Sequence, residues 1–385
     1  MSKRMERIQA PIIPIVGQWI KETPGTISLG QGIVYYSPPP QAKEKIQTFF
    51  QHPHNHHYQA VHGISPLLEA IRLKLHTDNK IDLSEAQKIV VTAGGNFAFS
   101  NAIFAIADPG EEIIVPTPYY FNHEMAITMA GCRTVEVMVD DNYQLRLDAM
   151  EAAITPKTRA ILTVSPNNPS GVVYPETDLR AVNALCRKYG LYHIHDEAYE
   201  YFTYDGVEAF SPASIPDSES YTISLFSLSK AYGFASWRIG YMVIPSNLFE
   251  AIRKIQDTQL ICAPVISQYA ALGALEAGKA YSLSKSGPIR AARQQFLQAF
   301  SELEGLIDVP ESAGAFYFLM RVRSQKSSNE LAENLVRKHK IAVIPGSTFG
   351  LHQGCYLRIA YASLKEDLLE EGIQRLVKGL KAELE

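Results

Sequence analysis

Seven short apolar runs, rich in β-branched residues, constrain the fold more than any other feature of this sequence. They occupy residues 88–93, 112–116, 134–139, 160–164, 192–196, 222–226 and 240–244, and most are separated by helix-like segments. Continuous apolar runs are typical of strands buried on both faces, and helical connections between strands favour parallel pairing. The pattern therefore predicts an α/β fold built on a mostly parallel seven-stranded sheet with helices on both faces.

The length of the chain indicates a second domain. At 385 residues it exceeds one ordinary hydrophobic core, and a hydrophobic content of 46% is enough to fill two. After a helical stretch around residues 266–277, short strands are expected at 316–320 and 342–344. We expect a smaller α/β domain beside the sheet. The predicted boundaries are 1–45 for an N-terminal arm and part of the small domain, 46–285 for the large domain and 286–385 for the small C-terminal domain.

Charge and cysteine content narrow the class of partner. The net charge of -4 is small for this length and no long basic block is present, so we expect small-molecule partners rather than nucleic acid or a membrane. The N-terminus shows no apolar signal core and the chain no membrane-spanning run. The cysteines are scattered without the spacing of a disulfide framework or zinc site, which indicates reduced thiols and a cytoplasmic location. They are Cys132, Cys186, Cys262 and Cys355.

A lysine beside hydroxyl and guanidinium groups is the strongest chemical signal. Lys230 ends the run Ser227-Leu228-Ser229-Lys230, and Arg238 follows eight residues later. A lysine amine forms a Schiff base with an aldehyde, while hydroxyls and a guanidinium fork hold a phosphate. Pyridoxal 5'-phosphate is the cofactor that needs all three groups together. We therefore predict that Lys230 binds this cofactor; the alternative is an ordinary surface lysine.

Polar residues after two other runs would complete such a site. Asp196 ends an apolar run and would keep a pyridine nitrogen protonated, although an aspartate there also suits a helix N-cap. Tyr199 offers a phenol to the ring oxygen of the cofactor. Asn168 would donate a hydrogen bond to the same oxygen, unless it only forms an Asn-Pro turn. The three residues together predict a ring-binding surface.

A glycine turn before a predicted helix offers a place for the phosphate. The run Val91-Thr92-Ala93-Gly94-Gly95-Asn96 reads as a strand, a tight turn and a helix start. Free N–H groups and the helix dipole favour an anion at such a position.

With these residues together, the chain resembles the class I aminotransferases, the aspartate aminotransferase-like group of fold type I pyridoxal-phosphate enzymes, over nearly its whole length. The resemblance implies that Lys230 is the Schiff-base lysine, that Asp196 pairs with the pyridine nitrogen and that Tyr199 and Asn168 flank the ring hydroxyl. The residues that match the phosphate site are Gly94, Gly95, Asn96, Ser227, Ser229 and Arg238.

The resemblance also assigns residues outside these runs. Tyr120 matches the aromatic residue that stacks on the cofactor ring, and His123 matches a histidine that supports the aspartate. Tyr58 matches a tyrosine that reaches the phosphate of the neighbouring subunit. The implied assembly is a homodimer with shared active sites.

The implied substrates are an L-amino acid and a 2-oxo acid, which exchange an amino group by a ping-pong mechanism. Arg358 matches the arginine that binds the substrate α-carboxylate, for which a bidentate guanidinium fork is well suited. Gly32 matches a backbone position in the substrate pocket, beside Asn168. Lys230, once released, would be the base that moves the Cα proton.

Three features bear on the amino donor. Asn96 stands where one large prokaryotic branch of the family has a lysine after the glycine pair, which argues against aspartate. Residues 31–36 and 118–122 look like those of aromatic and methionine aminotransferases. Tyr35, Tyr36 and Phe316 could form an apolar side-chain pocket or simply pack in the core. We expect aromatic or methionine-like donors.

Other functions share the same residues. A C–S lyase or an aminocyclopropanecarboxylate synthase-like enzyme would use all of them, and an aspartate aminotransferase remains an alternative. A sensor domain is disfavoured because no DNA-binding module precedes the match. No metal site is predicted, because the histidine-rich segment at residues 52–57 lacks the paired spacing of a zinc site and reads as an interface or entrance loop.

Overall fold

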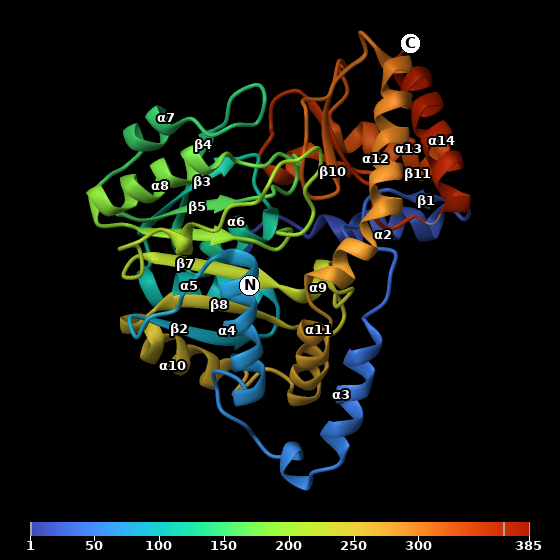
Figure 1. The fold of residues 1–385 in the computed structure, drawn as a ribbon. Helices are drawn as coiled ribbons and strands as arrows, with labels where there is room; N and C mark the ends of the chain where they lie inside the picture. The colour runs from blue at the N-terminus through green and yellow to red at the C-terminus, as the bar shows by residue number, and fades with distance from the viewer. Residues whose placement is uncertain (1, 365, 385) are drawn as a thin grey trace.

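The largest sheet of the molecule has seven strands and lies at the left of Figure 1. The computed structural model describes residues 2–364 and 366–384. The prediction of an α/β fold with seven sheet strands is confirmed, and the strand ends differ from the expected ones by at most two residues. In the order β2-β8-β7-β6-β5-β3-β4, the sheet contains β2 (Gln87–Thr92), β3 (Glu112–Thr117), β4 (Arg133–Met138), β5 (Thr158–Val164), β6 (Tyr192–Asp196), β7 (Thr222–Ser227) and β8 (Gly240–Pro245).

Helices cover both faces of this sheet, as the unbroken apolar runs require. In β2, Val90 packs into the cluster under α5, whereas Ile89 and Val91 pack toward α4. One face carries α5 (Gly95–Ile106), α6 (Phe121–Met129) and α10 (Phe249–Gln259). The other carries α4 (Ser65–Asn79), α7 (Leu147–Ala152), α8 (Glu176–Tyr189) and α11 (Val265–Ser284).

The direction of β8 departs from the parallel pattern. It runs antiparallel to both β2 and β7, while β3 to β7 pair in parallel. Gly240, the first residue of β8, therefore lies opposite Thr92 and Ser227, the last residues of its neighbours. This reversal brings the segment before β8 to the edge where the parallel strands end.

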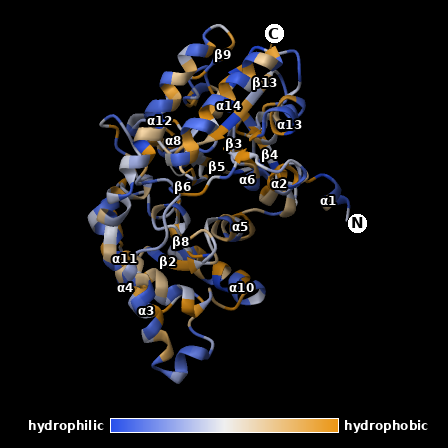
Figure 2. Ribbon diagram, turned by 90° about the vertical axis from the view of Figure 1, so that its right-hand side faces the viewer, coloured by the Kyte–Doolittle hydropathy of each residue, from blue (hydrophilic) through white to orange (hydrophobic). Residues whose placement is uncertain are grey.

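A second hydrophobic core lies beside the sheet, around a small antiparallel sheet of order β12-β13-β10-β9. Helix α14 (Glu366–Leu384) buries an apolar stripe there, and Figure 2 shows hydrophobic and hydrophilic bands alternating along it. The other elements of this part are β1 (Ile27–Ser28), which pairs with β11 (Ile341–Ala342), α12 (Ser286–Phe300), η4 (Ser301–Leu303), β9 (Ile307–Asp308), β10 (Tyr317–Val322), α13 (Ser328–His339), β12 (Ile344–Pro345), η5 (Gly346–Phe349) and β13 (Cys355–Ala360).

Helix α3 (Pro40–Phe50) packs along α11 at the lower right of Figure 1. The two backbones approach closely at Gly273, where an added Cβ would lie 2.2 Å from the carbonyl oxygen of Gln41. Only glycine permits this approach. Near its end α11 is interrupted at Gly278, whose φ of 66° is not helical.

The remaining elements are short or lie near the N-terminus. None of the helices in the described residues is long and apolar enough to span a membrane. The remaining bounds are α1 (Lys3–Glu6), α2 (Ile12–Glu22), η1 (Pro53–His56), η2 (Pro212–Ser214), α9 (Leu228–Ala231) and η3 (Ser246–Leu248).

Candidate active site

The predicted chemical residues meet at one edge of the large sheet. Asp196 ends β6, Lys230 lies in α9 directly after β7, and Gly95 begins α5 shortly after β2. Ligands of open α/β sheets bind at this edge, where the parallel strands end. Twelve of the predicted residues line a single cavity here: Gly32, Gly95, Asn96, Tyr120, Asn168, Asp196, Tyr199, Ser227, Ser229, Lys230, Arg238 and Arg358.

Positive charge dominates this cavity. Among its lining residues, Lys230, Arg238 and Arg358 are cationic and Asp196 is the only carboxylate. Burial, reinforced by Arg358 and Arg238, lowers the pKa of Lys230 to about 8, and Asp196 opposes that shift. Its Nζ donates a hydrogen bond to the carbonyl oxygen of Gly32 at 2.5 Å. Arg358 is buried and Lys230 is partly buried, whereas Arg238 is exposed. Cations held away from water need compensation, so the cavity suits an anionic ligand.

Asp196 is fixed from two sides. One oxygen, Oδ2, lies 3.1 Å from Nε2 of His123, and the other accepts a hydrogen bond from the backbone N–H of Ala198 at 2.9 Å. His123 is buried behind the cavity, between the rings of Phe99 and Tyr120. These contacts leave the carboxylate at the cavity wall with its orientation set.

Arg358 is held by polar and aromatic groups together. Its Nη1 donates to Oδ1 of Asn168 at 2.8 Å and its Nη2 to the carbonyl oxygen of Gly30 at 2.6 Å. The guanidinium lies 4.6 Å from the ring centre of Tyr317 and 5.0 Å from that of Phe349. Its buried Nε has no hydrogen-bond partner among the described residues. A charged, oriented fork with an unused donor is a carboxylate-binding arrangement.

The glycine turn and Arg238 form the opposite wall. Gly94 has a φ of 86°, which disfavours any residue with a side chain, and a Cβ there would lie 2.3 Å from Nη2 of Arg238. Arg238 itself has a φ of 54°, an uncommon conformation for a residue with a side chain, which is often found at functional sites. The side chain of Ser227 accepts a hydrogen bond from the N–H of Ser229. The N-terminus of α5, the hydroxyls of Ser227 and Ser229 and the guanidinium of Arg238 therefore face the same space.

Besides His123, two further predicted residues do not line the cavity. One is Gly94, whose neighbour Gly95 does line it. Tyr58 follows η1 and is 81% exposed, so within one chain it contacts no part of the site.

Several lining residues were not among the predicted site residues, although Phe121 lies in the segment 118–122 that bore on the amino donor. They are Ile13 from α2, Phe121 and Val164, Ala198, and Tyr317 at the start of β10. Their contribution depends on contacts between distant segments, which no local motif encodes. A strand alternation around residue 317 would have indicated one inward face but not what it faces.

Of the two interpretations given for Tyr35, Tyr36 and Phe316, a substrate pocket or core packing, the structure supports core packing, because none of the three lines the cavity. The hydroxyl of Tyr36 donates to the backbone of Lys230, and that of Tyr35 to the carbonyl of Lys285. Phe316 is fully buried between Tyr199 and Phe202. All three pack in the second hydrophobic core instead.

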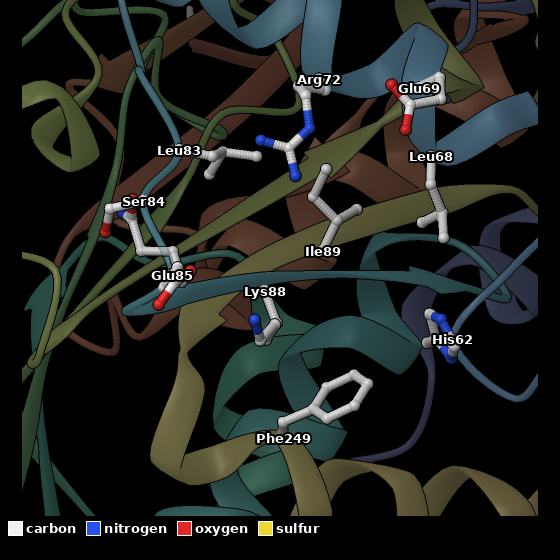
Figure 3. Close-up of a pocket in the computed structure, with 11 residues that line it drawn as sticks. His62, Leu68, Glu69, Arg72, Leu83, Ser84, Glu85, Lys88, Ile89 and Phe249 are labelled. Atoms are coloured by element: carbon white, nitrogen blue, oxygen red, sulfur yellow. The ribbon is translucent and has the colours of Figure 1, made fainter. Parts of the chain in front are cut away.

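A larger hollow of about 490 Å³, against about 200 Å³ around Lys230, lies at the outer edge of β2 (Figure 3). Ile89 and Arg72 lie on one side of the strand and Lys88 and Phe249 on the other. The charged residues that line this larger hollow are of both signs and mostly exposed. Its lining residues include no enclosed nucleophile comparable to Lys230 in the smaller cavity. Chemistry rather than size identifies the cavity around Lys230 as the candidate active site.

Comparisons with known proteins agree with this assignment. The family profile described as aminotransferase class I and II matches residues 24–376. The aromatic-amino-acid aminotransferase 2 of Thermococcus litoralis is 30% identical over 99% of this chain and 98% of its own length. The probable aspartate/prephenate aminotransferase of Aquifex aeolicus is 34% identical over 83% of this chain and 82% of its own.

The fold agrees as well. A mutant of the aspartate aminotransferase of Thermus thermophilus superimposes with a TM-score of 0.90 and 28% identity, over 98% of this chain and 99% of that one. The resemblance inferred from the sequence is thereby confirmed. The chain belongs to the class I and II aminotransferases, a family of enzymes that use pyridoxal 5'-phosphate to move amino groups between amino acids and 2-oxo acids.

Proposed function

We propose that this aminotransferase binds pyridoxal 5'-phosphate in the cavity around Lys230 and transfers the amino group of an aromatic or methionine-like L-amino acid to a 2-oxo acid. The observation that carries the proposal is the convergence of Lys230, Arg238 and Arg358 with the single carboxylate Asp196 in one cavity. A phosphate and a substrate carboxylate would balance this charge.

The residues present fit the cofactor. The helix N-terminus at Gly95 and Asn96, with Ser227, Ser229 and Arg238, suits its phosphate, and Asp196, braced by His123, suits its pyridine nitrogen. Tyr120 would stack on the ring, and Asn168 and Tyr199 would contact its hydroxyl. When bound, the cofactor supplies an electron sink for the charge left after the Cα proton is removed.

The chain's own groups would orient the substrate and move that proton. Arg358 would bind the α-carboxylate through its fork, since its Nε is unused and its plane is fixed by Asn168 and Gly30. Lys230, with its pKa lowered to about 8, has enough neutral amine near neutral pH to take a proton from Cα and return it elsewhere.

The lining favours an apolar donor side chain. Besides the three cations already assigned, the described lining residues include no further positive group for the distal carboxylate of aspartate, and Asn96 is neutral. Ile13 and Phe121 contribute apolar surface. The Thermococcus relative is named for aromatic amino acids, whereas the Aquifex relative is named for aspartate and prephenate. The lining supports the first of these preferences.

Two statements about the whole protein belong to the same proposal. We propose a homodimer in which Tyr58 reaches the partner's site, supported by the exposure of Tyr58 and Phe50 beside η1. The domain boundaries proposed are 1–45 with 286–385, and 46–285. A second hydrophobic core drawn mostly from residues 27–36 and 289–380, to which Tyr199, Phe202 and Tyr204 also contribute, supports them. A cytoplasmic location is supported by the four free cysteines.

The decisive experiment is a single turnover of the cofactor-loaded enzyme with a panel of amino acids and no added oxo acid. We expect phenylalanine, tyrosine or methionine to give one equivalent of 2-oxo acid and one of pyridoxamine phosphate per site, both measured by chromatography. Aspartate should react more slowly. Purified protein without the cofactor's visible absorbance after reconstitution would contradict the assignment of Lys230.

The same measurement separates transamination from elimination. A C–S lyase would release pyruvate and ammonia from a sulfur-containing amino acid over many turnovers while the pyridoxal form persists. An aminocyclopropanecarboxylate synthase-like enzyme would also keep that form. Accumulation of either product set would replace the proposed reaction.

A further inference from the structure

Tyr317 occupies a position between the two halves of the site. It begins β10, is 1% exposed and lines the cavity. In the antiparallel ladder of β10 and β13 it pairs with Ala360, while Leu319 pairs with Arg358. Tyr317 and Arg358 are therefore diagonal neighbours on one face of the small sheet, where long side chains meet. Their side chains extend together toward the large sheet.

The ring and the hydroxyl of Tyr317 make different contacts. The ring lies under the Arg358 guanidinium, 4.6 Å from ring centre to guanidinium carbon. The hydroxyl is 2.8 Å from that of Tyr199. Burial raises the pKa of Tyr317 to about 12 and raises that of Tyr199 well above its ordinary value, so both phenols keep their protons at neutral pH. One hydroxyl donates to the other, and a proton remains for a third partner.

The Tyr317 hydroxyl explains why residue 32 is a glycine. A Cβ on Gly32 would lie 2.1 Å from the Tyr317 hydroxyl oxygen, so that oxygen fills the space of a side chain. The carbonyl of Gly32 accepts the hydrogen bond from Lys230. Tyr317 therefore packs directly against the backbone that holds the lysine.

We propose that Tyr317 is a positioning residue with two separable roles: its ring holds the Arg358 guanidinium in place for a substrate carboxylate, and its hydroxyl fixes Tyr199 and the Gly32 backbone. The inference rests on the proposed function, since it assigns the carboxylate to Arg358 and the cofactor hydroxyl to Tyr199. It adds a residue that links the two halves of the site.

A matched pair of substitutions separates the roles. Tyr317→Phe keeps the ring and removes the hydroxyl, whereas Tyr317→Leu removes both. In the cofactor-loaded enzyme, we expect Tyr317→Phe to bind the unreactive carboxylate 3-phenylpropanoate within about twofold of wild type, while kcat falls about fivefold, the effect of one neutral hydrogen bond. The pH midpoint of the cofactor's visible absorbance should also shift, because Tyr199 loses its partner.

Tyr317→Leu should in addition weaken 3-phenylpropanoate binding about tenfold, as expected for loss of a desolvated cation–π contact. Titration calorimetry measures this affinity, and equilibrium titration of the cofactor-free enzyme measures cofactor affinity. Equal effects of the two substitutions on carboxylate affinity would overturn the role of the ring. An unchanged absorbance midpoint and kcat in Tyr317→Phe would overturn the role of the hydroxyl.

A rescue experiment tests the contact with Gly32. Gly32→Ala alone should be nearly inactive, because its Cβ meets the hydroxyl. In the double variant Gly32→Ala with Tyr317→Phe, the nearest remaining ring carbon would be 3.1 Å away, which a small shift accommodates. We expect the double variant to be more active than Gly32→Ala; a double variant that is no better would contradict the contact.

Wild-type enzyme distinguishes failure of this inference from failure of the proposed function. If wild type neither binds the cofactor nor binds 3-phenylpropanoate, the proposed function falls, and this inference with it. If wild type does both and the Tyr317 variants match it in every measurement, only the inference falls. Thermal unfolding of each variant shows whether lost binding reflects lost folding.

Discussion

Asn96 is the side chain that bears most directly on the proposed donor preference. It lies at the first turn of α5 and lines the cavity, where the described residues offer no cation beyond Lys230, Arg238 and Arg358. A distal carboxylate on the substrate would meet a neutral amide there. The amide carries no charge to compensate the carboxylate, so under the proposed function it would not select an acidic donor.

Replacing this amide with a cation should change the donor preference. We expect Asn96→Lys to raise kcat/KM for aspartate relative to phenylalanine about tenfold, the effect of one charge-assisted hydrogen bond. Steady-state rates with both donors measure the ratio. Asn96→Gln, which lengthens the side chain without adding charge, is the control. A ratio that stays constant in Asn96→Lys would indicate that the distal group binds elsewhere.

Glu197 follows Asp196 but is buried on the side of α4. Burial, with repulsion from Glu200, raises its pKa to about 8 from an ordinary value near 4.5, and Ser211 and Lys74 partly oppose the shift. Between these two pH values the unfolded carboxyl has lost its proton while the folded one keeps it. The free energy of unfolding therefore decreases as the pH rises through this window, by up to about 1.4 kcal/mol per pH unit.

Glu197→Gln should remove this dependence. The variant should lose less of its Tm than wild type between pH 5 and pH 8, because its neutral amide resembles the protonated acid at every pH. Thermal unfolding at both pH values measures the difference. Glu304→Gln, at an exposed position, should behave like wild type. If Glu197→Gln and wild type lose the same Tm, the buried acid is not the source.

At the level of elements, the presence of each strand was easier to predict than the direction in which it runs. All seven large-sheet strands were predicted, because strands buried on both faces have unbroken apolar sequences. The antiparallel direction of β8 was not, since its residues Gly240–Pro245 are as apolar as those of its parallel neighbours and carry no sign of direction. Arg238, predicted as a phosphate-binding residue from its local motif, nevertheless lines the cavity.

Contacts between elements were the least predictable part. Lys230 and Asp196 belong to short motifs next to strands, and the cavity contains both. Tyr317 and Ile13 reach the same cavity from the small sheet and from α2, and their local sequence resembles that of core residues. Tyr36 and Phe316 were candidates for a substrate pocket but pack in the core. Aromatic residues near a motif suit a pocket and a core equally well, so the sequence does not distinguish the two.

The packing of α3 on α11 gives a prediction at this scale. Gly273→Ala should lower Tm, because the new methyl group would lie 2.2 Å from the Gln41 carbonyl oxygen and force the helices apart. Overpacking of this kind costs about 1–3 kcal/mol. Gly287→Ala in α12, where nothing lies within 4 Å, should leave Tm unchanged or raise it. Equal Tm values for the two variants would contradict the close approach.

For the whole molecule, the exposed Tyr58 suggests a test of shared sites. Chains carrying Lys230→Ala or Tyr58→Ala should each be impaired alone. If Tyr58 serves the partner's site, mixing them yields hybrid dimers in which one site has both original residues. After random exchange of subunits, about a quarter of all sites would be intact.

Recovery of activity after mixing, measured against each variant exchanged with itself, would support the shared site. The unmixed variants at the same total concentration are the control. Mixtures that stay at the average of the two variants, despite subunit exchange shown by native mass spectrometry, would mean that Tyr58 acts within its own chain or not at all.

The pairing of β1 with β11 has a consequence for synthesis on the ribosome. Ile27 lies opposite Ile341, and the cavity combines Gly32 with Arg358, so residues made first must wait for residues made near the end. The large sheet, contained in residues 87–245, can begin to assemble during translation, since domains fold as units. Strand β1 cannot pair with β11 at that stage, and the apolar residues next to it stay exposed until translation is almost complete. We expect chaperones to bind the exposed apolar residues of the nascent chain mainly during that interval.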